Sequence, residues 1–221
     1  MWRYAPFMDF LPDLLEHELV DEVIVFDNDP SRTPDTGILD HPKINYQCVG
    51  ENIYVNPAWN KGVELSRNKF VAFISDDVIF DLRLLSRVAQ VLSDKCGVIG
   101  NCPGLAEYNQ KPFKNGSINL VPWYHDHTFG FGCLMFVYKD TYLPIPDGLK
   151  LFYGDQWIFD TYMARGYPNW IITNMLFHTP HAATTTDPST NLDIDKFMTD
   201  EKIIYDPAFA EFMQQLYAPV R

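Results

Sequence analysis

Apolar side chains recur at helical spacing in several stretches of the chain. The first stretch predicts a helix over residues 9–19, with Pro12 in its first turn, where a proline is tolerated. The second predicts a helix that begins at Asn56 as its N-cap, with Pro57 at the first helical position. Further helices are expected from Asp81, over residues 153–165 up to Gly166 and, as two short helices, after residue 191.

Short apolar runs alternate with these helices in the first hundred residues. The runs at 23–26 and 70–74 are typical of fully buried strands, and strands are also expected at 44–49 and 98–100. This alternation predicts an α/β domain with a mostly parallel central sheet flanked by helices. In such sheets the carboxyl ends of the strands form the crevice that binds ligands.

The pattern changes beyond residue 100. Residues 101–128 are rich in Gly, Asn, Pro and aromatics, and the clear strand signals that follow are at 133–138 and 170–173. A single domain is expected over residues 1–221, in three parts: about 1–100, 101–185 and a helical tail over 186–221.

The charge of the chain limits its partners. The formal net charge is −12, which argues against an extensive nucleic-acid surface, because such surfaces need clustered Lys and Arg. A nucleotide remains compatible with this charge, since a divalent cation can neutralise its phosphates locally.

The cysteines and the apolar runs indicate a cytoplasmic protein without a transmembrane segment. Cys48, Cys96, Cys102 and Cys133 lack the close pairs of a zinc site and are expected to be free thiols in a reducing compartment. We find no signal-peptide pattern, and no apolar run approaches the roughly 20 residues of a membrane span.

Acidic side chains follow two of the predicted strands. Asp76 and Asp77 come directly after the run at 70–74, where carboxylates could hold a divalent metal that bridges nucleotide phosphates. Alternatively, Asp76 caps a turn and Asp77 is only solvated. Asp27 ends the strand at 23–26 and could accept hydrogen bonds from a base or ribose, or could simply form a turn.

Asp155 stands at the start of a predicted helix. A carboxylate there could act as a general base, or it could be an ordinary helix-start Asp stabilised by the helix dipole. His178 and His181 follow the last strand and could complete a metal shell, although a His is more often structural. His125 and His127 form a weaker metal signal because they lie in a loop.

Aromatic side chains are abundant at helix and loop positions. Trp59, Trp123, Tyr124, Tyr153 and Trp157 could stack on sugar rings, or could form core and crevice walls.

Taken in order, several segments resemble the family 2-like glycosyltransferases of the GT-A fold, within the nucleotide-diphospho-sugar transferase superfamily. The resemblance covers about residues 6–185. It is carried by the strand ending at Asp27, the helix from Asn56 to Gly62, the strand ending at Ser75-Asp76-Asp77, the segment around Gly132, the Gly154-Asp155-Gln156-Trp157 segment and the late histidines.

The resemblance implies a metal-dependent inverting transferase that moves a sugar from a nucleoside-diphosphate sugar to an acceptor hydroxyl. It implies Asp155 as the catalytic base, and Mn²⁺ or Mg²⁺ held by Asp77 with His178 or His181. It also implies a nucleotide-sugar half before about residue 100 and an acceptor half over 101–185. The implied substrate-binding residues are Asp27, Asn28, Asn56, Asn60, Asp76, Trp123, Gly132 and Trp157.

The chain departs from the family pattern in ways that leave other functions open. Ser75 replaces the first Asp of Asp-x-Asp, Gly154 replaces a Glu, and the family's first strand is missing. A catalytically inactive relic that binds a nucleotide-sugar or glycan is therefore an alternative. A nucleotidyltransferase is another, although the chain lacks the Gly-rich basic loop expected near its start, and a metal hydrolase built on His125 and His127 is a remote one. Glycan, lipid, protein and modified base all remain possible acceptors.

Overall fold

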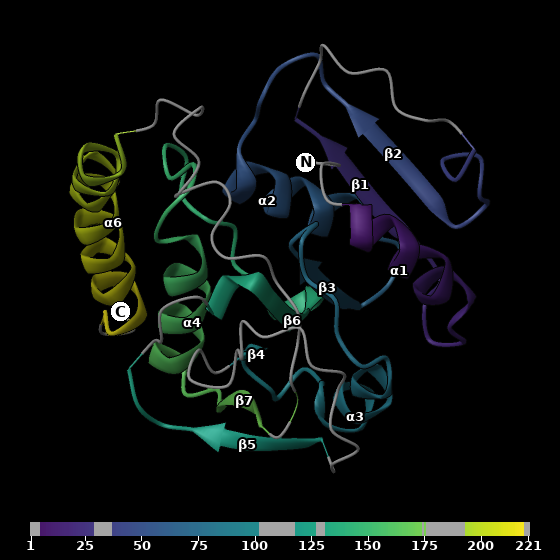
Figure 1. The fold of residues 1–221 in the computed structure, drawn as a ribbon. Coiled ribbons are helices and arrows are strands. Elements are labelled where there is room, and N and C mark those ends of the chain that lie inside the picture. Colours follow the sequence, from purple (N-terminus) through teal and green to yellow (C-terminus); the bar gives the residue numbers. More distant parts are fainter. Residues whose placement is uncertain are drawn as a thin grey trace.

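The computed structural model describes residues 5–28, 37–101, 118–126, 131–173, 175 and 193–218, and its fold is mixed α/β (Figure 1). The strands are β1 Val23–Asp27, β2 Ile44–Cys48, β3 Phe70–Ile74, β4 Ile99–Asn101, β5 Asn119–Trp123, β6 Leu134–Tyr138 and β7 Asn169–Thr173. The helices are α1 Ala5–Glu16, α2 Val55–Leu65, α3 Arg83–Val91, α4 Gly154–Ala164 and α6 Ile194–Leu216, with short 3₁₀ turns η2 Phe131–Cys133 and η3 Lys139–Thr141.

Strands β3 to β7 form one sheet in the order β3-β6-β4-β7-β5, while β1 and β2 form a separate parallel pair. Within the larger sheet only β4 and β7 are parallel, and every other neighbouring pair is antiparallel. The prediction of a mostly parallel sheet was therefore wrong. Its basis, the alternation of strands with crossover helices, stops near residue 100, and the later strands β5 and β6 run against their neighbours.

The sheet nevertheless gathers several strand ends at one edge. Because β3 and β4 both run against β6, and β7 runs with β4, the carboxyl ends of β3, β4 and β7 lie beside the start of β6. Ile74 is opposite Leu134, and Asn101 is opposite Ile172. This edge is where the sequence predicts the ligand crevice.

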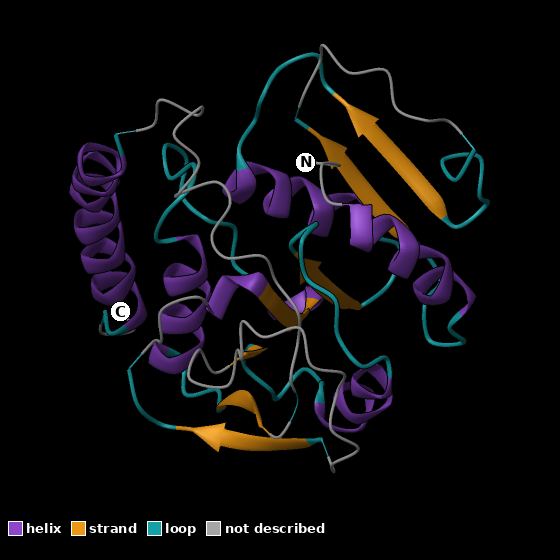
Figure 2. Ribbon diagram, viewed as in Figure 1, coloured by secondary structure: helices purple, strands orange, loops and turns teal. Residues whose placement is uncertain are grey.

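Strand β6 is the centre of the core. Its residues alternate between the two faces of the sheet, with Leu134 and Phe136 in one apolar cluster and Met135 and Val137 in the other. All four are at most 3% exposed. The first cluster includes α1 and α3, and the second includes α4 and α6, which lie side by side on one flank of the molecule (Figure 2).

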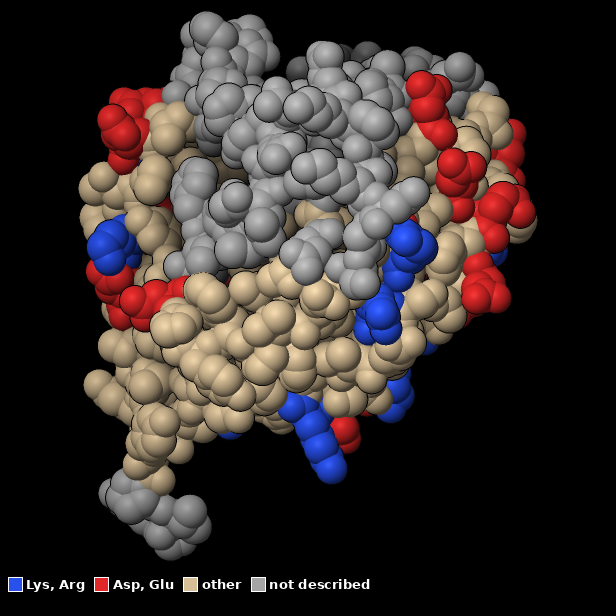
Figure 3. Space-filling view, turned by 60° about the horizontal axis from the view of Figure 1, so that its bottom comes forward, with Lys and Arg blue, Asp and Glu red and all other residues tan. Residues whose placement is uncertain are grey.

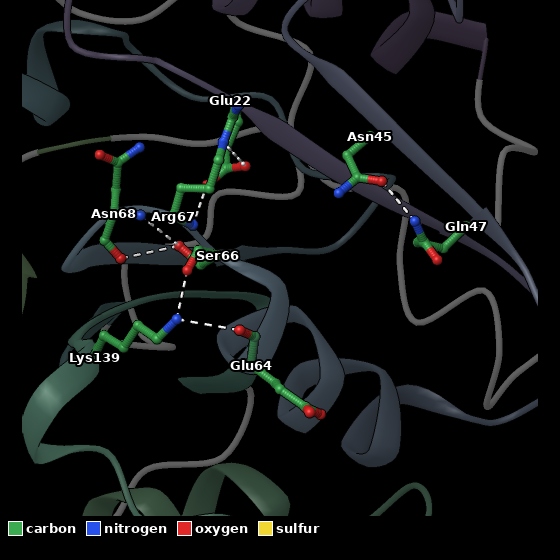
Figure 4. A network of polar contacts seen from close by, with 8 residues as sticks. All are labelled: Glu22, Asn45, Gln47, Glu64, Ser66, Arg67, Asn68 and Lys139. Carbon is green, nitrogen blue, oxygen red and sulfur yellow. Dashed lines mark hydrogen bonds and ion pairs between the residues drawn. The ribbon is translucent and has the colours of Figure 1, made fainter.

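A polar network ties the β1–β2 pair to the larger sheet (Figure 4). Glu22, just before β1, accepts hydrogen bonds from the backbone N–H of Arg67 at 2.6 Å and from its Nε at 3.0 Å. Lys139 donates to the carbonyls of Glu64 and Ser66 at the end of α2. Among the described strands, none pairs with the second edge of β1 or of β3.

Two prolines lie inside helices, contrary to prediction. Pro12 lies in the interior of α1, which begins and ends earlier than expected, and Pro207 lies within α6, a single helix where two short ones were expected. A proline removes one backbone hydrogen bond, but side chains on both sides of it bury apolar surface. Leu11 and Leu15 are at most 2% exposed, so packing holds α1 together across Pro12.

The ends of the other helices follow the sequence signals only in part. The N-cap of α2 is Tyr54, with a φ of 63°. The prediction of Asn56 as the N-cap was therefore wrong, because Asn56 lies within the helix. Asp81 lies just before α3, and its Oδ1 accepts the backbone N–H of Arg83, the first residue of the helix, at 3.0 Å. The end of α4 before Gly166, whose φ is +81°, is confirmed.

Candidate active site

Asp76 and Asp77 follow β3 at the edge where the strand ends gather. The backbone N–H of Ser75 donates to the carbonyl of Cys133 at 3.1 Å, which extends the β3–β6 ladder by one residue. A tight turn follows, in which the N–H of Val78 donates to the carbonyl of Ser75 at 3.0 Å. Val78 is fully buried, whereas both carboxylates are half-buried. The turn therefore holds Asp76 and Asp77 at the edge and not in the core.

Asp155 is held at the start of α4 by two backbone donors. Its Oδ2 accepts the N–H of Gly132 and its Oδ1 accepts the N–H of Gln156, each at 3.0 Å. A Cβ at position 132 would lie 3.0 Å from the Trp59 ring and 3.1 Å from Asp155 Oδ2. Glycine therefore permits the close approach of this backbone to the carboxylate.

The Cys133 thiol connects Asp155 with the carboxylates after β3. Burial, followed by the negative charges of Asp77 and Asp155, raises the pKa of Cys133 to about 11. Both carboxylates therefore lie close enough to one thiol to disfavour its ionised form. Backbone hydrogen bonds agree with this, because the Ser75 N–H donates to the Cys133 carbonyl and the Gly132 N–H donates to Asp155, so the strand end before Asp77 and the start of α4 both contact residues 132–133.

Asn56 packs against the segment that leads into α4. Its side-chain N–H donates to the carbonyl of Phe152 at 2.9 Å, and its backbone N–H donates to the carbonyl of Lys150 at 3.0 Å. A Cβ on Gly154 would lie 2.1 Å from Asn56 Oδ1. The departure at position 154 thus has a physical reason, because any side chain there would collide with Asn56.

Asp27 lies at the end of β1, on the separate strand pair. It is only 2% exposed, and its Oδ2 accepts the hydroxyl of Tyr46 at 2.7 Å. Burial and this carboxylate raise the pKa of Tyr46 above its ordinary value. The neighbouring Asn28 accepts the backbone N–H of Ile53 at 3.1 Å, so it anchors the loop before α2.

The side chain of Asn60, which was predicted to bind substrate, forms hydrogen bonds to other residues of the protein. Its side-chain N–H donates to the carbonyl of Ile145 at 2.9 Å, and its Oδ1 accepts the Tyr142 hydroxyl at 2.7 Å and the N–H of Ile145 at 2.9 Å. These bonds hold the segment after η3 against α2.

Trp157, predicted to lie on the acceptor side, is a core residue 7% exposed. Its ring packs edge-on against Tyr205, Phe209 and Phe212 of α6. It therefore serves to dock α6 on α4.

Trp123 lies at the far end of the strands from Asp77. It is opposite Asn169, the first residue of β7, whereas the candidate site lies at the other end of that strand. Its Nε1 donates to the carbonyl of Asp126 at 3.1 Å, and its ring contacts His125 edge-on. The structure thus brings together Asn56, Asp77, Gly132 and Asp155, and leaves Trp123 outside this group.

The predicted metal-binding histidines His178 and His181 lie outside the described residues, as does His127. Within the part of the chain that the structure describes, no group of three or more His, Cys, Asp and Glu residues could hold a metal ion. The carboxylate oxygens of Asp77 and its neighbours are nevertheless the ligand type that Mn²⁺ and Mg²⁺ prefer.

Sequence reasoning missed two residues that shape this region. Tyr46 is one, and the signal for it was available, because a parallel partner of β1 places its alternate side chains beside those of β1. Glu201 is the other: it is a buried carboxylate between Asp200 and Lys202, and nothing in this run of charged residues distinguishes it from its neighbours.

In Figure 3, Asp and Glu residues lie mainly at the left and right margins, and the described residues between them are mostly neutral, with a few Lys and Arg residues toward the right. This agrees with the net charge of −12. Among the described helices, none is long and apolar enough to cross a membrane. No protein-family model and no curated protein matches this sequence.

Proposed function

We propose that the chain is a metal-dependent inverting glycosyltransferase of the GT-A fold, which moves a sugar from a nucleoside-diphosphate sugar to an acceptor hydroxyl. The observation that supports the proposal is that the end of β3 and the start of α4 contact the same segment: the Ser75 N–H, two residues before Asp77, donates to the Cys133 carbonyl, and the Gly132 N–H donates to Asp155. Inverting transfer uses a base on the acceptor side and charge stabilisation on the leaving-group side, and we assign these roles to Asp155 and to a metal held by Asp77.

Asp155 acts as the general base in this proposal. The acceptor oxygen forms a bond to the anomeric carbon as the bond from that carbon to the diphosphate oxygen breaks. The diphosphate leaves with the electron pair, and the acceptor proton passes to the Asp155 carboxylate. The N–H groups of Gly132 and Gln156 orient that carboxylate through one bond each.

Asp77, together with His178 or His181, would hold Mn²⁺ or Mg²⁺, with Asp76 beside it. The metal, when bound, supplies positive charge that stabilises the leaving diphosphate. Asp27 and Asn28 would contact the nucleoside, and Asn56 and Gly132 would shape the pocket around the reacting groups.

We place this activity in the cytoplasm. Cys48, Cys96 and Cys133 are free thiols, which is typical of proteins from reducing compartments.

A thermal-shift and hydrolysis screen tests the proposal. The purified chain is melted with UDP, GDP, dTDP and their sugars, each with Mn²⁺, with Mg²⁺ or with EDTA. A nucleotide at about 100 times its dissociation constant should raise the melting temperature by about 5–10 °C, and only in the presence of metal. The nucleotide-sugar that gives the largest shift should also be hydrolysed slowly without an acceptor.

Two outcomes would redirect the assignment. Metal-dependent binding without hydrolysis or transfer to any acceptor class would favour an inactive binding protein. An absence of metal-dependent nucleotide binding would overturn the proposal. A matched control for the shift is Asp94→Asn, which alters an exposed carboxylate in the loop between α3 and β4 and should leave the shift unchanged.

A further inference from the structure

Helix α6 inserts a buried carboxylate into a row of backbone donors. Glu201 is 3% exposed, and its two oxygens accept the N–H groups of Lys150, Leu151 and Phe152 at 2.8, 2.9 and 2.7 Å. Hydrogen bonds to an ionised acceptor are stronger than those between neutral groups. Three consecutive N–H groups thus fix this segment to α6.

The same segment is held from its other side by α2. The side chain of Asn56 donates to the carbonyl of Phe152, and its backbone N–H donates to the carbonyl of Lys150. Glu201 therefore engages the N–H groups of a segment whose carbonyls are engaged by Asn56. Little freedom remains for the backbone between residues 150 and 152.

The clamped segment leads within three residues to the candidate base. Tyr153 adopts a left-handed conformation with a φ of 58° and a ψ of 0°, and Gly154 follows it directly against Asn56. Asp155 comes next, with its carboxylate on the N–H of Gly132. Any shift of residues 150–152 would move the start of α4 and with it the direction of this carboxylate.

Docking of α6 does not itself require a carboxylate at position 201. Tyr205, Phe209 and Phe212 already pack against Trp157 and supply apolar contacts between α6 and α4. Burial of an ionised side chain is costly unless hydrogen bonds compensate it. The placement of Glu201 on three N–H groups thus serves the segment before α4 more than the docking of α6.

We propose that Glu201 is a positioning residue that sets the orientation of Asp155 through residues 150–154. This inference rests on the proposed function, because it assigns Glu201 a purpose in the reaction that Asp155 carries out. The effect of Glu201 on the Asp155–Gly132 hydrogen bond is the structural part of the inference, and it can be measured independently of any activity.

The structural test is amide hydrogen exchange of Gly132 in ¹⁵N-labelled protein, since that N–H reports the position of the Asp155 carboxylate. Glu201→Gln should accelerate exchange at Gly132 as well as at residues 150–152. Glu211→Gln, an exposed change on the same helix, should leave Gly132 unchanged. Faster exchange confined to residues 150–152 would overturn the inference.

The kinetic test separates positioning from general destabilisation. Glu201→Gln should lower kcat by at least about tenfold, with the donor KM changed less than twofold. In an Asp155→Asn background the same change should have no further effect on the residual rate, because its route acts through Asp155. An equal loss of rate in both backgrounds would overturn the inference.

A third variant covers a failure of Glu201→Gln to fold, which circular dichroism and a cooperative melt would reveal. Glu201→Asp keeps the charge but shortens the side chain, and should give an intermediate rate of exchange at Gly132. If the wild-type chain transfers no sugar while Gly132 still responds to these variants, the proposed function fails and the link from Glu201 to Asp155 stands. If it transfers sugar and Gly132 does not respond, only the link fails.

Discussion

Oδ2 of Asp155 lies 3.0 Å from the backbone nitrogen of Gly132, a residue 23 positions earlier in the chain. This hydrogen bond joins the start of α4 to the segment before β6. It therefore fixes the candidate base relative to the edge of the sheet where Asp76 and Asp77 lie.

Replacement of Asp155 by Asn should strongly slow sugar transfer and leave nucleotide binding intact. The amide keeps the size of the side chain and an oxygen for the Gly132 N–H, but it cannot accept the acceptor proton. We expect a loss of rate of about 10²–10⁴-fold, measured as turnover at saturating donor. Metal-dependent UDP binding, measured by calorimetry, should stay within about twofold of wild type, within the additivity error of such comparisons. Loss of binding with turnover per bound donor preserved would contradict the assigned role.

The Cys133 thiol should report the two carboxylates through its pH dependence. Its pKa is raised from 9.0 to about 11, so its alkylation, followed by mass spectrometry, should accelerate only near that pH. Asp77→Asn and Asp155→Asn should each shift the inflection to lower pH, because each removes a negative charge that disfavours the thiolate. The exposed change Asp94→Asn should not shift it. An unchanged inflection in both site variants would contradict the proximity of the carboxylates.

The same thiol should also make the fold less stable in alkaline solution. The unfolded thiol ionises near pH 9, whereas the folded thiol keeps its proton until about pH 11. The contribution is thus fully present below about pH 9 and is lost as the pH rises through about 11. Urea unfolding of wild type and Cys133→Ser between pH 8 and 11 should show a steeper loss in the wild type. Parallel curves for the two proteins would refute this.

Gly154→Ala should destabilise the protein, although alanine normally favours a helix over glycine. The added Cβ would lie 2.1 Å from Asn56 Oδ1, and we expect a cost of about 1–3 kcal/mol in the free energy of unfolding. Gly37→Ala, where a Cβ would meet nothing within 4 Å, is the matched control. The cost at position 154 should shrink in an Asn56→Ala background. Unchanged urea midpoints for Gly154→Ala would contradict the predicted clash, because Asn56 would then move aside at no cost in stability.

Glu22 should contribute more to stability than its exposed partner Arg67. The Glu22 side chain is 8% exposed and the Arg67 side chain 71% exposed. Arg67→Ala keeps the backbone N–H bond to Glu22, so its cost should be below about 1 kcal/mol, as for other exposed ion pairs. Glu22→Ala removes the acceptor of both hydrogen bonds from Arg67 and should cost about 1–3 kcal/mol.

The Lys69–Asp140 ion pair provides the control for this comparison. Both partners are more than half exposed, so Lys69→Ala should change the free energy of unfolding by less than about 1 kcal/mol. Equal effects of Glu22→Ala and Lys69→Ala on urea midpoints would contradict the linking role of Glu22.

The local elements of the fold were largely readable from the sequence. The run at 70–74 forms β3 as predicted, because an unbroken apolar run of that length between polar segments has few other solutions. The expectation of a fully buried strand was wrong, because β3 is the last strand of its sheet and Phe70 is 49% exposed. The inner face of α3, with Leu84 and Val88, was readable for the same reason. These signals depend only on neighbours within a few residues.

Strand direction was not readable, because a strand has the same side-chain period whichever way it runs. The pattern at 133–138 predicted a strand but not the antiparallel placement of β6 between β3 and β4. The helices that contain Pro12 and Pro207 were also predicted wrongly, because the stabilising contacts around a proline depend on the tertiary structure. The rule for Pro207 counts the lost hydrogen bond but not the aromatic contacts of Tyr205 and Phe209 on either side of it.

The candidate site was partly readable. The strand-end rule led to Asp77, and the helix start led to Asp155. The aromatic residues were ambiguous, since a Trp side chain suits a crevice wall and a core equally well. Trp157 lies in the core, and nothing in its residue type distinguishes that position from a wall. Glu201 was hidden because its partners are backbone groups 49 to 51 residues earlier in the chain.

The division of the strands into two separately hydrogen-bonded sheets has a consequence for affinity. Asp27 belongs to the β1–β2 pair, whereas Asp77 and Asp155 belong to the larger sheet and its helices. An isolated two-stranded pair is only marginally stable, so β1 and β2 depend on their packing against α1 and α2. A ligand that contacts both groups of residues would act as a cross-link between them, beside the Glu22–Arg67 contact, and would oppose any opening of one unit from the other. Part of its binding free energy would then be used to suppress that opening, and its affinity should rise with any change that tightens the β1–β2 pair onto the rest of the fold.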